Sequence, residues 1–147
     1  MTNLTLRPAR EMDSAAIKDL IYSVGINPMS LDWKRFVVAV DAQAQVVATG
    51  QIKPHGRDIL ELASIAVKPE YRGQGLARAL IEHLLKDSPR PLYLTCVSPL
   101  EPFYNKFGFI SIPYREMPRY FQRISKLAGL VFTLASRGES LLVMKLQ

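Results

Sequence analysis

The chain has 147 residues, of which 48% are hydrophobic and 22% charged. This length is typical of one compact domain with its own core, and the composition excludes a disordered or low-complexity chain. A formal net charge of +6 favours anionic partners in general, without choosing among nucleic acid, anionic lipid and phosphate-bearing small molecules. We therefore expect one globular domain over residues 1–147.

Metal and membrane proteins are disfavoured by the residues present. The chain has one cysteine, Cys96, and two histidines, His55 and His83, whose separation matches no usual zinc-binding spacing. Its longest apolar stretch is far shorter than the roughly 20 residues that span a membrane, and the first residues contain no apolar run of signal-peptide length. We expect no metal, no membrane span and a cytoplasmic location.

The first half of the chain predicts one helix among four strands. Alternation at the start indicates a strand, and Ile17, Leu20, Ile21 and Val24 have helical spacing. The predicted elements are a strand over 4–8, a helix over 11–24, and strands over 35–40, 46–52 and 59–67. The segment 54–56 is interpreted as a turn, in which His55 would be solvated.

The second half changes to a helical period and then alternates. The predicted elements are a helix from about 75 to 86, a strand over 92–97, a short helix over 99–107, a strand over 109–112, a helix from about 118 to 134 and a strand over 141–146. The whole order, β-α-β-β-β-α-β-α-β-α-β, predicts a mixed α/β fold with helices on both faces of a central sheet.

The helix expected over 118–134 has two distinct flanks. Arg115, Arg119 and Arg123 recur every four residues and share one flank. An apolar stripe forms the other, made of Tyr120, Phe121, Ile124, Leu127, Ala128 and Val131. Either the helix forms a wall of an acceptor site or a homodimer contact, or the stripe packs on the sheet and the arginines face water.

The segment 61–78 places a strand, a glycine-rich turn and a helix start in succession. Gly73 and Gly75 would let the backbone approach a ligand, and the unpaired amides of the helix start suit a pyrophosphate. The alternative is that the glycines only make a tight turn. A dinucleotide fingerprint would need a third glycine where Arg78 stands, and the Gly-Lys-Ser/Thr of a P-loop is absent.

Two motifs carry a resemblance to the GNAT acetyltransferase superfamily. Arg72, Gly75 and Ala77 match its Gln/Arg-x-x-Gly-x-Gly/Ala pattern, and the segment 104–109 resembles its Tyr-x-Lys-x-Gly-Phe segment. Val97 departs from the asparagine of many members, and the insert between 109 and 141 is longer than usual. The resemblance implies a mostly antiparallel, twisted sheet of about seven strands, splayed between the fourth and fifth, with an extra helix before the last strand.

The same resemblance implies acetyl-CoA as co-substrate. It would bind where the fourth and fifth strands separate, with the pantetheine arm on the fourth strand and the pyrophosphate on the glycine turn. The implied cofactor-binding residues are Ile65, Ala66, Val67, Arg72, Gly73, Gln74, Gly75, Leu76, Ala77 and Arg78. Arg78 is equally compatible with a solvated helix position.

Acetyl transfer to an amine needs a base for the ammonium and an acid for the departing thiolate. Tyr104 is the candidate acid, because a phenol is protonated at neutral pH and the resemblance places this one beside the thioester sulfur. Glu61 is the candidate base, although an exposed strand-end glutamate is as good an interpretation. Cys96 is interpreted as a small buried hydrophobe.

The sequence therefore predicts an acetyl-CoA-dependent N-acetyltransferase that acts by direct attack of a primary amine in a ternary complex. Two alternatives remain. One is a non-catalytic acyl-CoA-binding or regulatory module on the same fold. The other is a protein that binds nucleic acid or anionic membranes through Arg115, Arg119, Arg123 and Lys126.

Overall fold

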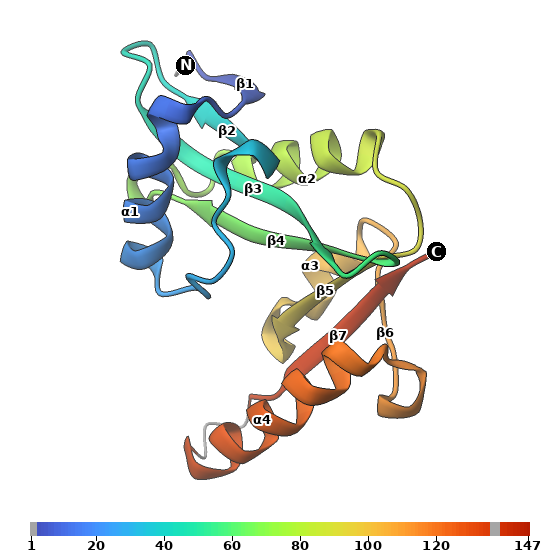
Figure 1. Ribbon diagram of the computed structural model, residues 1–147. Coiled ribbons are helices and arrows are strands. Elements are labelled where there is room, and N and C mark those ends of the chain that lie inside the picture. The colour runs from blue at the N-terminus through green and yellow to red at the C-terminus, as the bar shows by residue number, and fades with distance from the viewer. Residues whose placement is uncertain (1–2, 136–138) are drawn as a thin grey trace. The chain divides into compact units, whose positions relative to one another are not determined.

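The computed structural model describes residues 3–135 and 139–147, and it describes side chains to residue 129 and again from 139. Figure 1 shows the helices and strands of this part of the chain. The strands are β1 (Thr5–Pro8), β2 (Phe36–Val40), β3 (Val46–His55), β4 (Ile59–Val67), β5 (Leu92–Val97), β6 (Ile110–Ser111) and β7 (Leu141–Leu146). The α-helices are α1 (Ser14–Val24), α2 (Leu76–Lys86), α3 (Glu101–Asn105) and α4 (Arg119–Ala135).

The strands form a sheet in the order β1-β2-β3-β4-β5-β7-β6. The pairs β1–β2, β2–β3, β5–β7 and β7–β6 are antiparallel. The strands β4 and β5 run parallel and are paired at Glu61 and Tyr93. This arrangement confirms the predicted mixed α/β fold with a mostly antiparallel seven-stranded sheet, and the short parallel pairing fits the predicted splay between the fourth and fifth strands.

The chain divides into two compact units. Unit 1 comprises residues 1–53 and 62–88, and unit 2 comprises residues 54–61 and 89–147. In unit 1 the alternation of side chains along β2 sends Val38 into one apolar cluster with Ile17 and Ile21 of α1. Ala39 enters another cluster with Leu80 of α2. Helices therefore cover both faces of the strands of unit 1, as predicted.

Unit 2 is built around β5 and β7, which pair along their whole length from Leu92–Leu146 to Val97–Leu141. Phe121 of α4 is fully buried and packs with Tyr93 and Val143. The inserted helix is thus anchored on the sheet. None of the helices in the described part of the chain is long and apolar enough to cross a membrane.

Three details differ from the sequence prediction. The strand β3 continues to His55 instead of ending at 52, so residues 54 and 55 are strand and not turn, and the turn to β4 lies at 56–58. The strand β6 has two residues instead of four. Leu127 of the predicted apolar stripe is 65% exposed, because α4 presents only part of the stripe to the sheet, and the Val131 side chain lies outside the described ones.

An ion pair joins β1 to the start of α1 in unit 1. Arg7 Nη1 donates to Asp13 Oδ2 at 2.7 Å, and the Arg10 amide donates to the same oxygen at 2.7 Å. Asp13 is 5% exposed. The Arg7 hydrogen bond is the main reason that the pKa of Asp13 lies below its usual value, with desolvation opposing it and the Arg10 amide assisting.

We expect Asp13→Asn to lower the free energy of unfolding by about 2 kcal/mol at pH 7, since hydrogen bonds to a charged group are lost. Because the pKa of Asp13 is lower in the folded state, its ionised carboxylate stabilises the folded protein at pH values above the unfolded-state pKa. This contribution to the free energy of unfolding disappears as the pH falls through the folded-state pKa. Urea unfolding at several pH values should therefore show wild type and variant converging in acid. Asp19→Asn, at an exposed position of α1, is the control, and equal losses in both variants would contradict this account.

Candidate active site

The glycine turn before α2 has the geometry of an anion-binding loop. Gly73 and Gly75 both have φ of 79°, and an added Cβ at either would meet no atom within 4 Å. Gly75 is the N-terminal cap residue of α2, and no side chain forms a capping hydrogen bond there. The backbone beside the start of this 11-residue helix is thus open to a ligand, and its first-turn amides carry partial positive charge. These residues fit a pyrophosphate.

The basic residues of this turn are already engaged within unit 1. Arg72 Nε donates to the carbonyl oxygen of Val67 at 3.3 Å. Arg78 Nε donates to Glu82 Oε1 at 2.9 Å, and the Arg78 side chain is 72% exposed. Leu76 is buried among α2 and strand residues, so its amide, not its side chain, is available to a ligand. Arg78 is therefore a solvated helix residue in this structure.

The strand β4 carries an irregularity that sequence patterns did not indicate. Ser64 has φ of 60°, a left-handed conformation that is unusual for a residue other than glycine. Thr49 Oγ1 donates to its carbonyl oxygen at 2.9 Å, and Gln51 Nε2 donates to its hydroxyl at 2.8 Å. Side chains of β3 thus hold this backbone in place, just before Ile65, Ala66 and Val67.

Gln51 is fully buried, and the nitrogen and oxygen of its side-chain amide differ in their hydrogen bonding. Nε2 donates to Ser64 Oγ and to the Ser30 carbonyl at 3.3 Å. Oε1 has no hydrogen-bond partner among the described residues. A buried acceptor of this kind is satisfied by a water or by a donor from a ligand.

Glu61, the predicted base, lies in unit 2 and is buried at 6% exposure, so the alternative of an exposed strand-end glutamate is wrong. Its Oε1 is 2.7 Å from His55 Nε2. The interpretation of His55 as a solvated turn residue is also wrong, since its side chain is 13% exposed at the end of β3. The reason is the length of β3, which includes His55 and so keeps its ring within hydrogen-bonding distance of Glu61.

Aromatic rings from α4 and β5 surround the His55–Glu61 pair. Tyr120 stacks on the His55 ring, with centroids 3.7 Å apart and planes at 21°. Phe121 meets the same ring edge-on at 6.0 Å and lies 5.3 Å from Tyr93. Burial, and secondarily the charge of Glu61, raises the pKa of the Tyr120 phenol.

Tyr104, the predicted acid, follows β5 on α3. Its ring is 5.1 Å from that of Phe103 and 6.3 Å from that of Phe109. Burial, followed by the nearby Cys96, raises the pKa of Tyr104 to about 12, so the phenol keeps its proton at neutral pH. Cys96 is 7% exposed, and burial, followed by Glu101, raises its pKa to about 11. A buried, protonated thiol is the small hydrophobe that the sequence predicted.

The structure brings Glu61 together with His55 and Tyr120, whereas Tyr104 stands apart from them. Tyr93, which pairs with Glu61, and Cys96, which neighbours Tyr104, are three positions apart on β5. Alternation along a strand places such positions on opposite faces. Glu61 and Tyr104 share no hydrogen bond in the described part of the chain.

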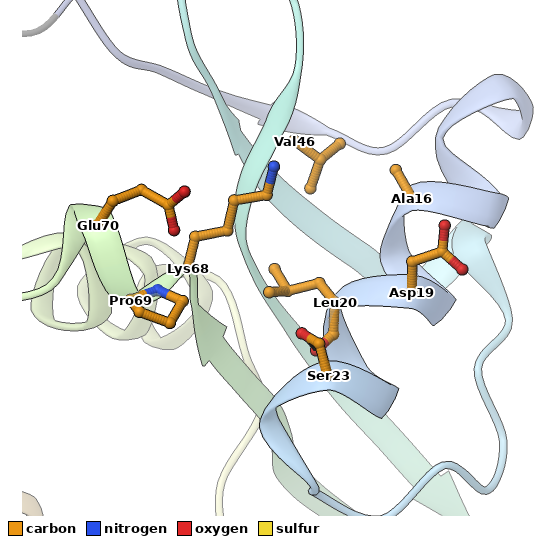
Figure 2. A pocket seen from close by; sticks show the side chains of 8 residues that line it. All are labelled: Ala16, Asp19, Leu20, Ser23, Val46, Lys68, Pro69 and Glu70. Carbon is orange, nitrogen blue, oxygen red and sulfur yellow. Dashed lines mark hydrogen bonds between the residues drawn. The ribbon is translucent and has the colours of Figure 1, made fainter.

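A separate pocket of about 350 Å³ lies in unit 1, and none of the predicted site residues lines it. Figure 2 shows its lining, with α1 on one side and the segment after β4 on the other. The lining residues are Ala16, Asp19, Leu20, Ser23, Val46, Lys68, Pro69 and Glu70.

Residues 32–111 match the family described as "Acetyltransferase (GNAT) domain", and this match covers more than half of the chain. The chain therefore belongs to the GNAT acetyltransferase family. A search of curated proteins found no match.

Solved structures share this fold. Rv2747 from Mycobacterium tuberculosis, in complex with CoA and NLQ, is 23% identical over 95% of this chain and 97% of its own, with a TM-score of 0.68. N-acetylglutamate synthase from Neisseria gonorrhoeae, complexed with coenzyme A and N-acetyl-glutamate, is 16% identical over 100% of this chain and 36% of its own, with a TM-score of 0.71. Escherichia coli ElaA is 17% identical over 100% of both chains, with a TM-score of 0.68. These likenesses confirm the predicted GNAT-like fold.

Sequence reasoning missed three elements of the candidate site. The partnership of His55 with Glu61 was one, and the conformation of Ser64 was another. The third was the contact of Tyr120 with His55. A signal for the first existed, because a tight turn between two strands brings the residues on its two sides close together.

Proposed function

We propose that this protein transfers the acetyl group of acetyl-CoA to a primary amine of a small-molecule or protein acceptor, by direct attack in a ternary complex. The observation that carries the proposal is the open turn at Gly73 and Gly75 in front of α2, which suits the pyrophosphate of a CoA. Membership of the GNAT family supports it, as do relatives of the same fold that were solved with CoA.

In this proposal the co-substrate is held mainly by backbone groups. The amides from Gly73 to Arg78 bind the pyrophosphate, and strand β4 at 65–67 pairs with the pantetheine arm. The carbonyl oxygen of Val67 is shared with Arg72, whose guanidinium group lies at the start of the turn and can add charge to a phosphate contact. Bound acetyl-CoA supplies an activated acyl group as a thioester.

The proton transfers are assigned to two groups. Tyr104 protonates the departing CoA sulfur, since its phenol is protonated at neutral pH. The base is assigned to the pair formed by the buried Glu61 and His55, of which Glu61 stands on the strand that also carries residues 65–67. Aligning a free amine with the thioester carbonyl supplies the remainder of the rate enhancement.

We expect Tyr104→Phe to lower kcat by about 10²-fold or less, because general acids contribute about 10²–10⁴-fold and a CoA thiolate is already a fair leaving group. The KM for acetyl-CoA should barely change, since the ring remains. Steady-state kinetics under conditions where chemistry limits the rate measures both parameters. Tyr22→Phe, at a position 67% exposed on α1, is the control, and an unchanged kcat in Tyr104→Phe would remove this tyrosine from the mechanism.

The proposed function is tested by mixing the protein with acetyl-CoA and a panel of amines and measuring the release of free thiol. The panel includes glutamate, because the gonococcal relative is complexed with N-acetyl-glutamate. Amine-dependent thiol release supports the proposal. Acetyl-CoA binding without turnover would favour the non-catalytic acyl-CoA-binding module, and salt-sensitive binding of DNA or anionic vesicles without acetyl-CoA binding would favour the anionic-surface binder.

A further inference from the structure

In the His55–Glu61 pair, the carboxyl group of Glu61 orients the imidazole ring of His55. When Glu61 is ionised its carboxylate only accepts hydrogen bonds, so in that state Nε2, 2.7 Å from Glu61 Oε1, is the donor of this contact. A neutral ring in that arrangement has its lone pair on Nδ1. No hydrogen bond engages Nδ1 among the residues that the structure describes. The same division of roles occurs wherever a carboxylate orients a histidine base.

The neighbours of the His55 ring restrict its plane. Tyr120 stacks on one face at 3.7 Å, and Phe121 approaches edge-on at 6.0 Å. Titratable and charged groups near the pair, among the described residues, include groups on its own strand and on the elements packed against it. Lys53 of β3 is buried and lies two positions before His55, on the same side of the strand. Tyr120 of α4, Tyr93 of β5, and Lys145 of β7, whose Nζ is 5.9 Å from the centre of the Tyr93 ring, lie on the other elements. The group in direct hydrogen-bonding contact with the imidazole is the Glu61 carboxylate.

We propose that His55 Nδ1 takes the proton from the acceptor amine and that Glu61 is a positioning residue that fixes the tautomer and balances the imidazolium charge. This inference rests on the proposed function and deepens it. It also gives the inserted helix α4 a role in catalysis, because Tyr120 holds the ring of the base. The Glu61 carboxylate acts through His55 rather than on the substrate.

The reaction balances with these groups. A bound ammonium passes one proton to Nδ1, and the freed lone pair forms the N–C bond at the thioester carbonyl carbon. The C–S bond then breaks, and the sulfur takes a proton from Tyr104. Water returns a proton to the phenol and accepts the second proton lost from nitrogen. His55 releases its proton to water. The products are the acetamide, CoA thiol and one proton.

Two His55 variants separate the roles of the pair. His55→Gln keeps an N–H donor for Glu61 but has no imidazole, so it preserves the buried contact without the base. We expect it to lower kcat/KM by about 10²–10⁴-fold, the usual contribution of a general base. His55→Ala should lose at least as much, and added imidazole should restore part of its kcat. His83→Gln, which changes the exposed second histidine on α2, should behave as wild type.

The Glu61→Gln variant tests the positioning role. It should lower kcat and displace the acidic limb of the kcat/KM profile between about pH 5 and 8, where imidazoles titrate. Its combination with His55→Gln should be no worse than His55→Gln alone, because residues that act as a unit are not additive. A Glu61 that acts as the base by itself would instead leave most of the activity in His55→Gln.

The outcomes distinguish failure of the proposed function from failure of the assignment of His55 as the base. Thiol release by wild type together with a kcat/KM and pH profile unchanged in His55→Gln would overturn the assignment of the base and leave the proposed function intact. No thiol release by wild type with any amine would overturn the proposed function and this inference with it. A loss in His55→Gln, rescue of His55→Ala by imidazole and non-additivity with Glu61→Gln support the inference.

Discussion

Replacing Gly75 with glutamate is expected to weaken acetyl-CoA binding by about 10³-fold. The new carboxylate would lie in the open space beside the start of α2, where the proposal places the pyrophosphate. It would repel the phosphates and displace about two charge-assisted hydrogen bonds, each contributing about 2 kcal/mol, and 1.4 kcal/mol corresponds to a tenfold change in affinity. Titration calorimetry measures the affinity directly.

The structure offers a matched control for the backbone strain of this change. Gly25 at the end of α1 has φ of 75°, close to the 79° of Gly75, and it also has nothing within 4 Å of an added Cβ. Gly25→Glu therefore carries the same conformational penalty away from the proposed binding loop. We expect it to bind acetyl-CoA as wild type does and to show the full ligand-induced rise in Tm. Equal affinity in the two variants would show that the pyrophosphate binds elsewhere.

Replacing Phe121 with alanine is expected to lower the free energy of unfolding by about 3–5 kcal/mol, the usual cost of removing a buried phenylalanine from a core. Phe121 is fully buried and lies against Tyr93, Tyr120 and Val143, so little can move to fill the cavity. Urea unfolding at pH 7, monitored by circular dichroism, measures the change.

Leu127→Ala on the same helix is the control for this prediction. Leu127 is 65% exposed, so its truncation should change the stability by no more than about 0.5 kcal/mol, as for most surface substitutions. Similar urea midpoints for Phe121→Ala and Leu127→Ala would contradict the anchoring of α4 on β5 and β7. A large difference between them supports it.

The elements of the fold were largely readable from hydrophobic periodicity and turn residues. Strand β4 has the predicted bounds at 59–67, since Pro69 cannot continue a ladder and Asp58 lies in a turn. The helix α4 was predicted within one residue at each end, because its apolar positions repeat with a helical period. The end of β3 was missed because Pro54 and Gly56 are typical of turns, whereas pairing with β4 keeps residues up to His55 in the strand.

By itself the sequence determined the elements that depend on neighbouring residues. These are the strand–glycine turn–helix segment from 61 to 78 and its open backbone at Gly73 and Gly75, because periodicity, chain reversal and left-handed φ angles are local properties. Only the tertiary structure decided the environment of Glu61. Its partner His55 comes from the preceding strand, and the ring that supports His55 comes from Tyr120, 65 positions further along the chain. Contacts between such distant residues depend on how α4 packs against β5 and β7, and packing of this kind leaves no periodic signal in the sequence.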